Sequence, residues 1–218
     1  MGVEKRKPDR RIAVTRSVIK DAMLALLQKD GFDRISVAEL CREAGVGRAT
    51  FYTHYTGMMD VIDELADDAI GAAEARSTSG LEQLEYLAGA VAKMEDSAEL
   101  AALADLLPLC QRVAEDARYK PLFRDDRIAE YIIMRVYRQE RAHVVPEMMR
   151  EIHISERQAE LIFLFSVMGA FAVNRALRWN RDETWYEMQR LMLTYAHAGN
   201  EALRKLNTGR KKHTKTGL

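Results

Sequence analysis

The sequence predicts an all-α protein of two domains, and this prediction rests on three observations. Only 4 prolines and 12 glycines interrupt the 218 residues, which are rich in Ala, Leu, Met, Glu, Arg and Lys. These residue types lose little side-chain freedom in a helix. Apolar residues recur at helical spacing along most of the chain. With 48% hydrophobic residues, the chain is also long enough to bury a substantial core.

Residues 1–56 are expected to form a basic arm and a three-helix head that contains a helix-turn-helix. Apolar positions spaced i, i+3, i+4 predict a first helix over 15–29. Ser36, with a glutamate three residues later, forms a capping-box signature that starts a second helix over 36–44. Gly45 is placed to end that helix, and a short turn leads into a third helix over 48–54.

A helical bundle body is expected over residues 57–206, followed by a flexible basic tail over 207–218. The expected helices of this body span 58–75, 81–93, 98–117, 126–149, 155–178 and 183–206. The most apolar run, 161–173, is shorter than the ~20 residues that cross a bilayer, so we expect a buried helix and no membrane partner. The two long helices at the end are expected to form the interface of a homodimer.

The charge of the chain is unevenly distributed, although its formal sum is zero. Residues 1–55 carry 11 basic and 7 acidic side chains, residues 56–203 carry 16 and 26, and residues 204–218 carry 6 and none. The N-terminal end therefore attracts polyanions, whereas the middle of the chain repels them.

The third helix of the head is the candidate DNA reader, because the second helix of a helix-turn-helix motif enters the major groove. Phe51 and Tyr55 are spaced i, i+4 and should face inward with Val46, which leaves the polar residues outside. Arg48 can form a bidentate pair with guanine or bind a phosphate. The alternative is an ordinary solvated helix face. The expected DNA-binding residues are Ser36, Arg48, Ala49, Thr50, Tyr52, Thr53 and His54.

Residues 36–65, SVAELCREAGVGRATFYTHYTGMMDVIDEL, resemble the helix-turn-helix signature of the TetR family of bacterial transcriptional regulators. The resemblance is carried by the Ser36 cap, the AGV turn at 44–46, Thr50, the aromatic pair Phe51 and Tyr52, His54 and Tyr55. It implies a cytoplasmic, homodimeric, one-component regulator whose body detects a signal. The stretch RATFYTHY is also similar to a subgroup in which some members are coactivators that bind another protein.

One short segment departs from the family pattern. Many members place a lysine near the start of their fourth helix to contact phosphate, and this chain has Gly57, Met58 and Met59 there. A basic arm could offset part of that loss by reaching the flanking backbone or the minor groove. The arm comprises Lys5, Arg6, Lys7, Arg10 and Arg11. The alternative is that the basic ends only keep the protein in solution.

The sequence therefore predicts a repressor that binds a palindromic operator in double-stranded DNA and is released by a small-molecule effector. The alternative is a coactivator of the same fold that binds a partner sensor protein. The residues expected to line an effector pocket are Tyr86, Met94, Phe123, Tyr131, Met134 and Tyr137. The residues expected in the dimer interface are Leu161, Phe165, Met168, Ala172, Trp185, Met188, Met192 and Tyr195.

Other functional classes find no support in the sequence. It contains no GxSxG, P-loop, GxGxxG or HExxH motif, so we expect no enzyme and no cofactor. The five histidines lack metal-ligand spacing, and we expect no metal site. Cys41 and Cys110 lie far apart and are expected to be buried, inert thiols in a reducing cytoplasm. No signal-peptide core follows the basic N-terminus.

Overall fold

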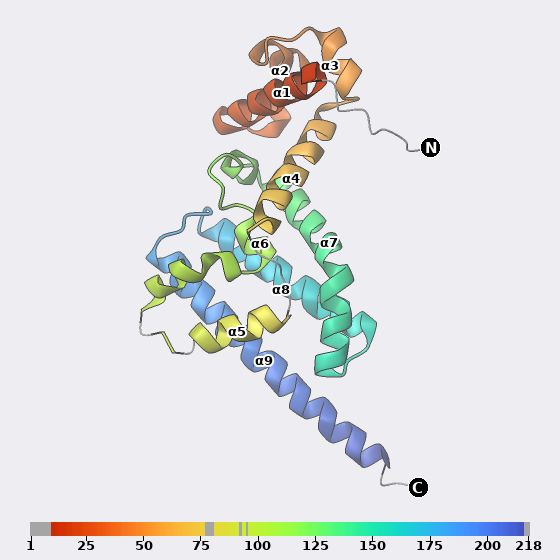
Figure 1. Ribbon diagram of the computed structural model, residues 1–218, viewed down its shortest axis with the longest axis vertical. Helices are drawn as coiled ribbons and strands as arrows, with labels where there is room; N and C mark the ends of the chain where they lie inside the picture. Colours follow the sequence, from red (N-terminus) through yellow and green to blue (C-terminus); the bar gives the residue numbers. More distant parts are fainter. Residues whose placement is uncertain (1–9, 77–80, 92, 95, 216–218) are drawn as a thin grey trace, which may run out of the picture. The chain divides into compact units, whose positions relative to one another are not determined.

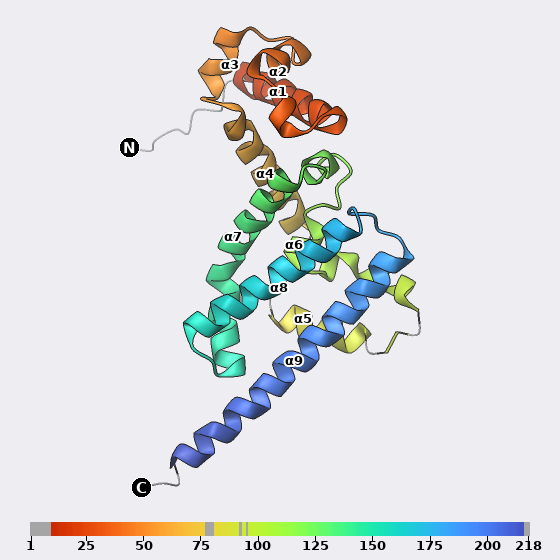
Figure 2. The ribbon, with the colours of Figure 1, turned by 180° about the vertical axis from the view of Figure 1, so that it is seen from behind.

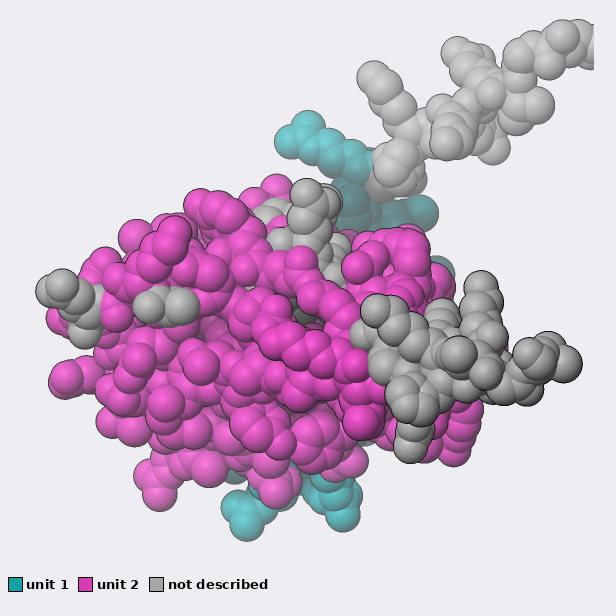
Figure 3. All heavy atoms as spheres, turned by 90° about the horizontal axis from the view of Figure 1, so that it is seen from below, with its two compact units in different colours: residues 1–69, 117–129 teal, residues 70–116, 130–218 magenta. Residues whose placement is uncertain are grey.

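The computed structural model describes residues 10–76, 81–91, 93–94 and 96–215. Within these ranges the chain forms helices and no strand, which confirms the predicted all-α class (Figure 1). The chain divides into two compact units, coloured separately in Figure 3. Unit 1 comprises Met1–Ala69 and Ala117–Ala129, and unit 2 comprises Ile70–Asp116 and Glu130–Leu218.

The head of the chain has the predicted order of helices. They are α1 (Arg10–Lys29), the 3-10 turn η1 (Phe32–Arg34), α2 (Val37–Glu43), α3 (Arg48–His54) and α4 (Met58–Glu74). The bounds of α3 agree with the prediction, whereas α1 starts at Arg10 rather than at Thr15. The basic residues Lys5, Arg6 and Lys7 of the expected arm lie outside the described residues.

Local signals explain where α2 begins and ends. The Ser36 hydroxyl oxygen accepts a hydrogen bond from the backbone N–H of Glu39 at 3.2 Å, which satisfies one of the free donors at the start of the helix. Gly45 then adopts a φ of +66°, the left-handed conformation that ends a helix at little cost only in glycine. The tight turn that presents α3 follows directly.

The core of unit 1 includes a segment from much later in the chain. Ile19 and Met23 of α1 are fully buried, as are Leu40 of α2 and Phe51 of α3. The 3-10 helix η3 (Lys120–Phe123) belongs to the same unit, contacts α1 and buries three of its four residues. The core of the head is thus completed by a segment some fifty residues beyond α4.

Unit 2 is built from the last residues of α4, most of α7 and the remaining helices. Its elements are α5 (Leu81–Val91), η2 (Ser97–Leu106), α6 (Leu109–Arg112), most of α7 (Asp126–Ile152), α8 (Glu156–Ala176) and α9 (Glu183–Lys215). In Figures 1 and 2, α5 lies across α9, and buried side chains of α5, η2 and α9 form one cluster around Leu87, Leu100 and Trp185. A second cluster joins the end of α7 to the start of α8.

The continuous helix predicted over 98–117 is wrong. The segment consists of the 3-10 helix η2, an extended break at Leu107 with φ −61° and ψ 152°, and the short helix α6. Pro108 explains the break, because its ring clashes with an α-helical conformation of the preceding residue.

The last two helices also differ from expectation. The apolar run of α8 is not a buried helix in a single protomer, since Leu161 is 47% and Phe165 is 66% exposed. By length and composition alone, α8 would be able to cross a membrane. Helix α9 continues to Lys215, beyond its predicted end at Leu206, and the Asn207 side chain helps to anchor it by donating to the Ile152 carbonyl at 3.0 Å.

Candidate nucleic-acid interface

The short helix α3 presents a mainly polar surface. It contains seven residues, of which only Phe51 is buried. Arg48, Ala49, Thr50, Tyr52 and Thr53 are exposed, and His54 is half-buried. The Tyr52 ring is 57% exposed although it packs edge-on against Phe51 at a centroid distance of 5.3 Å. Five of the six candidate DNA-binding residues of α3 are therefore exposed to solvent, and only His54 is partly covered.

The inward-facing residues lie where the spacing predicts. Phe51 is fully buried, Tyr55 is 3% exposed, and their ring centroids are 5.7 Å apart. Val46 is only half-buried. Ser36, also a predicted DNA contact, is exposed, and its oxygen already caps α2. A phosphate contact by Ser36 would have to use its hydroxyl hydrogen, which remains available for donation.

Sequence reasoning missed a polar cluster behind α3, the Glu64 cluster, which comprises Arg16, Lys20, Tyr55, Glu64 and Asp68. Oε2 of Glu64 accepts from the Tyr55 hydroxyl at 2.6 Å and from Arg16 Nε at 2.9 Å. Lys20 Nζ lies 3.1 Å from Oε1 of Glu64 and 2.6 Å from Asp68. The cluster therefore ties α1, the end of α3 and α4 together.

The ionisation of the Glu64 cluster follows from these contacts. Burial alone would raise the pKa of Glu64, but hydrogen bonds from Tyr55, Arg16 and Lys20 outweigh it and hold that pKa below its ordinary value. Burial, together with the neighbouring Glu64 carboxylate, raises the pKa of Tyr55. At neutral pH the cluster thus contains a carboxylate and a protonated phenol. In the sequence, the Glu64 cluster is indicated only by a pair of cations spaced i, i+4, Arg16 and Lys20, and a pair of acids with the same spacing, Glu64 and Asp68.

The start of α4, where this sequence has Gly57, Met58 and Met59, carries an acidic cap. Oδ2 of Asp60 accepts from the backbone N–H and the hydroxyl of Thr56, both at 2.6 Å, and from the Gly57 N–H at 3.3 Å. The Thr56 hydroxyl and backbone bonds hold the pKa of Asp60 below its ordinary value. Asp60 thus occupies donors that would otherwise be open to a phosphate.

Comparison with known families decides what this head is. The family model described as "Bacterial regulatory proteins, tetR family" matches residues 19–65, which include all of α2 and α3 and the Glu64 carboxylate. Residues 19–65 are a TetR-family DNA-binding domain. This domain supports a DNA-binding transcription regulator of the TetR kind. A comparison with curated proteins gave no match.

The residues predicted to line an effector pocket lie on several different elements of the chain. Tyr131, Met134 and Tyr137 are half-buried and recur at i, i+3, i+6 along α7. Met94 packs against the cluster between α5 and α9, and Tyr86 on α5 is 64% exposed. Phe123 is buried in unit 1. Only the three residues of α7 are brought onto one helix face.

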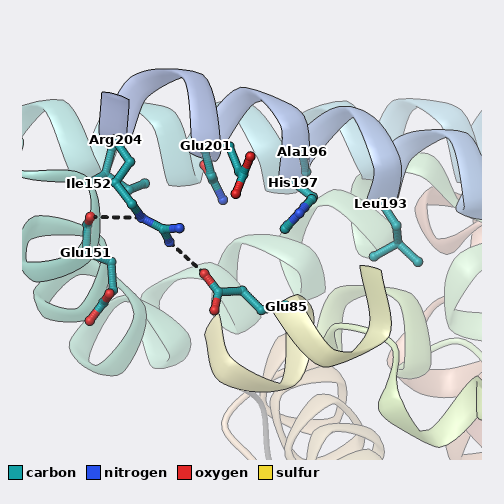
Figure 4. A pocket seen from close by; sticks show the side chains of 9 residues that line it. Glu85, Glu151, Ile152, Leu193, Ala196, His197, Glu201 and Arg204 are labelled. Carbon is teal, nitrogen blue, oxygen red and sulfur yellow. Dashed lines mark hydrogen bonds and ion pairs between the residues drawn. The ribbon is translucent and has the colours of Figure 1, made fainter. Parts of the chain in front are cut away.

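A pocket of unit 2 lies elsewhere, along one face of α9 (Figure 4). Its lining comprises Glu85, Glu151, Ile152, Leu193, Ala196, His197, Asn200, Glu201 and Arg204. Arg204 reaches from α9 to the Glu85 carboxylate at 2.6 Å and to the Glu151 carbonyl at 3.2 Å. Arg150 and Lys205 pair with the other two carboxylates, those of Glu151 and Glu201, so each acidic side chain that lines the pocket has a cationic partner.

The residues predicted for the dimer interface lie on α8 and α9. Leu161, Phe165, Ala172 and Tyr195 are exposed, and Met168, Met188 and Met192 are half-buried. Trp185 differs from the rest, because it is 1% exposed and faces the protomer's own core. Its indole N–H donates to Asn174 at 2.6 Å.

Proposed function

We propose that the chain is a homodimeric repressor that binds a palindromic operator through α3 and is released by an effector in its C-terminal body. The polar, exposed face of α3 is the observation that carries the proposal. Arg48 has the fork of donors that reads guanine, and Thr50 and Tyr52 offer hydroxyls to backbone oxygens. Small Ala49 lets the helix approach the bases closely.

Dimerisation is supported by the apolar side chains that one protomer leaves uncovered. Leu161 and Phe165 recur at i, i+4 on α8, and Leu191 and Tyr195 do so on α9. Burial of such side chains against a second copy yields ~25 cal/mol per Å² of apolar surface. A two-fold dimer also has the symmetry of a palindromic site, in which the two recognition helices read major grooves about 34 Å apart. We assign Trp185 to the core beneath this interface.

The proposed effector is a small molecule that contacts the face of α7 formed by Tyr131, Met134 and Tyr137. Tyr137 packs against Phe163 at 5.3 Å, and a flexible methionine beside two aromatic rings suits an adaptable apolar site. A ligand switches such a protein only by binding one conformation better than the other. The proposal places the regulator in the cytoplasm, with DNA, a second copy and the effector as partners and with no enzymatic activity.

Selection of bound sequences from random duplex DNA tests the proposal directly. The expected result is a palindromic site whose binding weakens steeply with salt, as phosphate counterions are released. Arg48→Ala and Tyr52→Ala should each reduce binding at least tenfold without unfolding the protein, since both side chains are exposed. Arg138→Ala, which removes an exposed arginine of unit 2, is the matched control. Failure to enrich any duplex at low ionic strength would refute the proposal.

One observation favours the alternative function, a coactivator that binds a partner sensor protein. Unit 1 exposes the apolar side chains of Ile12, Val14 and Val18 on α1 and of Met59 on α4. Exposed apolar side chains of this kind are suited to a protein contact. A coactivator would bind duplex DNA weakly alone and tightly only with a protein that copurifies from its native cytoplasm. Tight binding by the purified chain would exclude this alternative.

A further inference from the structure

We propose that Glu64 is a positioning residue for the recognition helix α3. Through Tyr55, Glu64 sets the orientation of α3 and so determines how well the protein discriminates its operator from other DNA. The inference rests on the DNA-binding function proposed above. It assigns a role to a residue that faces α1 and the end of α3 and that is no part of the DNA-binding face.

Helix α3 has few anchors of its own. It is two turns long, and Phe51 is its single buried residue. One buried ring holds the helix against the core but leaves its rotation about that contact weakly defined. A second anchor is therefore needed to fix the face that carries Arg48 and Tyr52.

Tyr55 supplies the second anchor at the point where the chain leaves α3. It is the C-cap residue, with extended backbone (φ −138°, ψ 143°) and a backbone N–H bonded to the Phe51 carbonyl. Its ring is buried, and its hydroxyl donates to Oε2 of Glu64 at 2.6 Å. A bond to a carboxylate is shorter and stronger than one between neutral groups, so it holds the end of α3 in one place.

Helix α1 holds the Glu64 carboxylate in turn. Arg16 Nε donates to Oε2 at 2.9 Å, and Arg16 Nη2 forms an ion pair with the same oxygen at 2.9 Å. The Arg16 guanidinium lies 5.3 Å from the centroid of the Tyr55 ring. Lys20 approaches the other carboxylate oxygen at 3.1 Å. Both oxygens of Glu64 are thus fixed from α1, and the Tyr55 hydroxyl meets an acceptor that does not move freely.

The same contacts give the cations of α1 a role that differs from phosphate binding. Arg16 pairs with Glu64, and Lys20 pairs with both Glu64 and Asp68. Two positive charges are balanced by two negative charges within one cluster. Loss of the Glu64 charge should therefore alter the placement of α3 rather than remove an attraction for DNA.

Two variants and one control test the inference. Glu64→Gln keeps the shape of the side chain but removes the charge that holds Arg16 and Lys20. Tyr55→Phe keeps the buried ring but removes the hydroxyl. Asp21→Asn is the matched control, because it removes one negative charge from α1 of the same unit and breaks an ion pair with Arg118. Each variant is first shown to be folded by circular dichroism at the temperature of the binding measurement.

The readout is the ratio of affinities for the selected operator and for a scrambled duplex. Glu64→Gln and Tyr55→Phe should each lower that ratio about tenfold, as expected for one lost hydrogen bond to a charged group. The double variant should lose little more than either single variant, because both act through one contact. The non-specific affinity of Glu64→Gln and its salt dependence should equal those of Asp21→Asn, which loses the same charge. Tyr55→Phe changes no charge and should equal the wild type in both, since no phosphate contact is lost.

The possible outcomes distinguish a failure of the proposed DNA-binding function from a failure of the role proposed for Glu64. If the wild-type chain binds no duplex selectively, the proposed function fails and this inference fails with it. If the wild type discriminates and both variants keep its ratio, the function stands and Glu64 is not a positioning residue. An equal loss of operator and scrambled binding would also overturn the inference, because it would identify the cluster as a source of general affinity.

Discussion

The Asp125 carboxylate accepts a hydrogen bond at 3.0 Å from the backbone N–H of Phe32, which lies 93 residues earlier in the chain. Its other oxygen accepts from the backbone N–H groups of Arg127 at 3.0 Å and Ile128 at 3.2 Å, and so caps the start of α7. Arg127 pairs with Asp33 at 2.7 Å. One side chain thus joins the turn before α2 to a helix that begins far later in the sequence.

Asp125→Ala should therefore lower the free energy of unfolding by about 1–3 kcal/mol, because it removes a helix cap and leaves the Phe32 N–H without its partner. Denaturant titration followed by circular dichroism measures this change. Asp126→Ala, at the next position, is the control and should change stability by less than about 0.5 kcal/mol, since its side chain is exposed. Equal effects of the two substitutions would contradict this role for Asp125.

A buried polar chain in unit 2 gives a second prediction. Asn174 donates to the Gln111 side chain at 2.6 Å and accepts from the Trp185 indole at 2.6 Å, and both Asn174 and Trp185 are 1% exposed. Asn174→Ala leaves two buried polar groups unsatisfied and should cost about 2–4 kcal/mol of stability. Thermal unfolding compares it with Asn180→Ala, an exposed asparagine that should be neutral. A neutral Asn174→Ala would show that water replaces the lost contacts.

The proposed dimer interface gives a third prediction. Phe165→Glu places a charge at an apolar position that is 66% exposed in a single chain, and it should convert dimers to monomers without unfolding the protomer. Sedimentation velocity measures the change in mass. Tyr86→Glu, at an aromatic residue of α5 with similar exposure, should leave the dimer intact. If both variants stay dimeric, the interface lies elsewhere.

Ser36 allows helix capping and phosphate binding to be separated. Ser36→Ala should destabilise the protein by about 1 kcal/mol, because the Glu39 N–H loses its acceptor. Ser36→Asp should keep the cap, because aspartate is as good an N-cap residue as serine. If Ser36 faces a phosphate, Ser36→Asp should still weaken DNA binding through charge repulsion. Undiminished binding by a stable Ser36→Asp would place Ser36 outside the interface.

The lowered pKa of Glu64 predicts a specific pH dependence. Its folded-state pKa lies below the ordinary value of 4.5, so the stability that Glu64 contributes is present above that value and is lost as the pH falls through the folded-state pKa. The free energy of unfolding should therefore rise with pH in this acidic window, and less so in Glu64→Gln. Denaturant titrations between about pH 3 and pH 7 measure both slopes. Parallel curves would show that Glu64 titrates alike in both states.

The sequence by itself determined the helices of the head and the outward face of α3. The signals are local: a serine three residues before a glutamate caps α2, Gly45 ends it, and the spacing of Phe51 and Tyr55 sets which side of α3 is buried. Such signals act within one or two turns, where chain connectivity already holds the residues together. Pro108 is also a local signal, and it breaks the helix expected over 98–117 because it prevents an α-helical conformation at Leu107.

Only the tertiary structure decided which distant residues act together. The Glu64 cluster joins side chains 48 residues apart, Asp125 joins η1 to α7, and Trp185 faces its own core rather than the outside. Composition and periodicity show that a helix has a polar or an apolar face, but not which neighbour covers that face. That choice depends on packing and hydrogen bonding between elements, whose free energy exists only once the chain has brought them together.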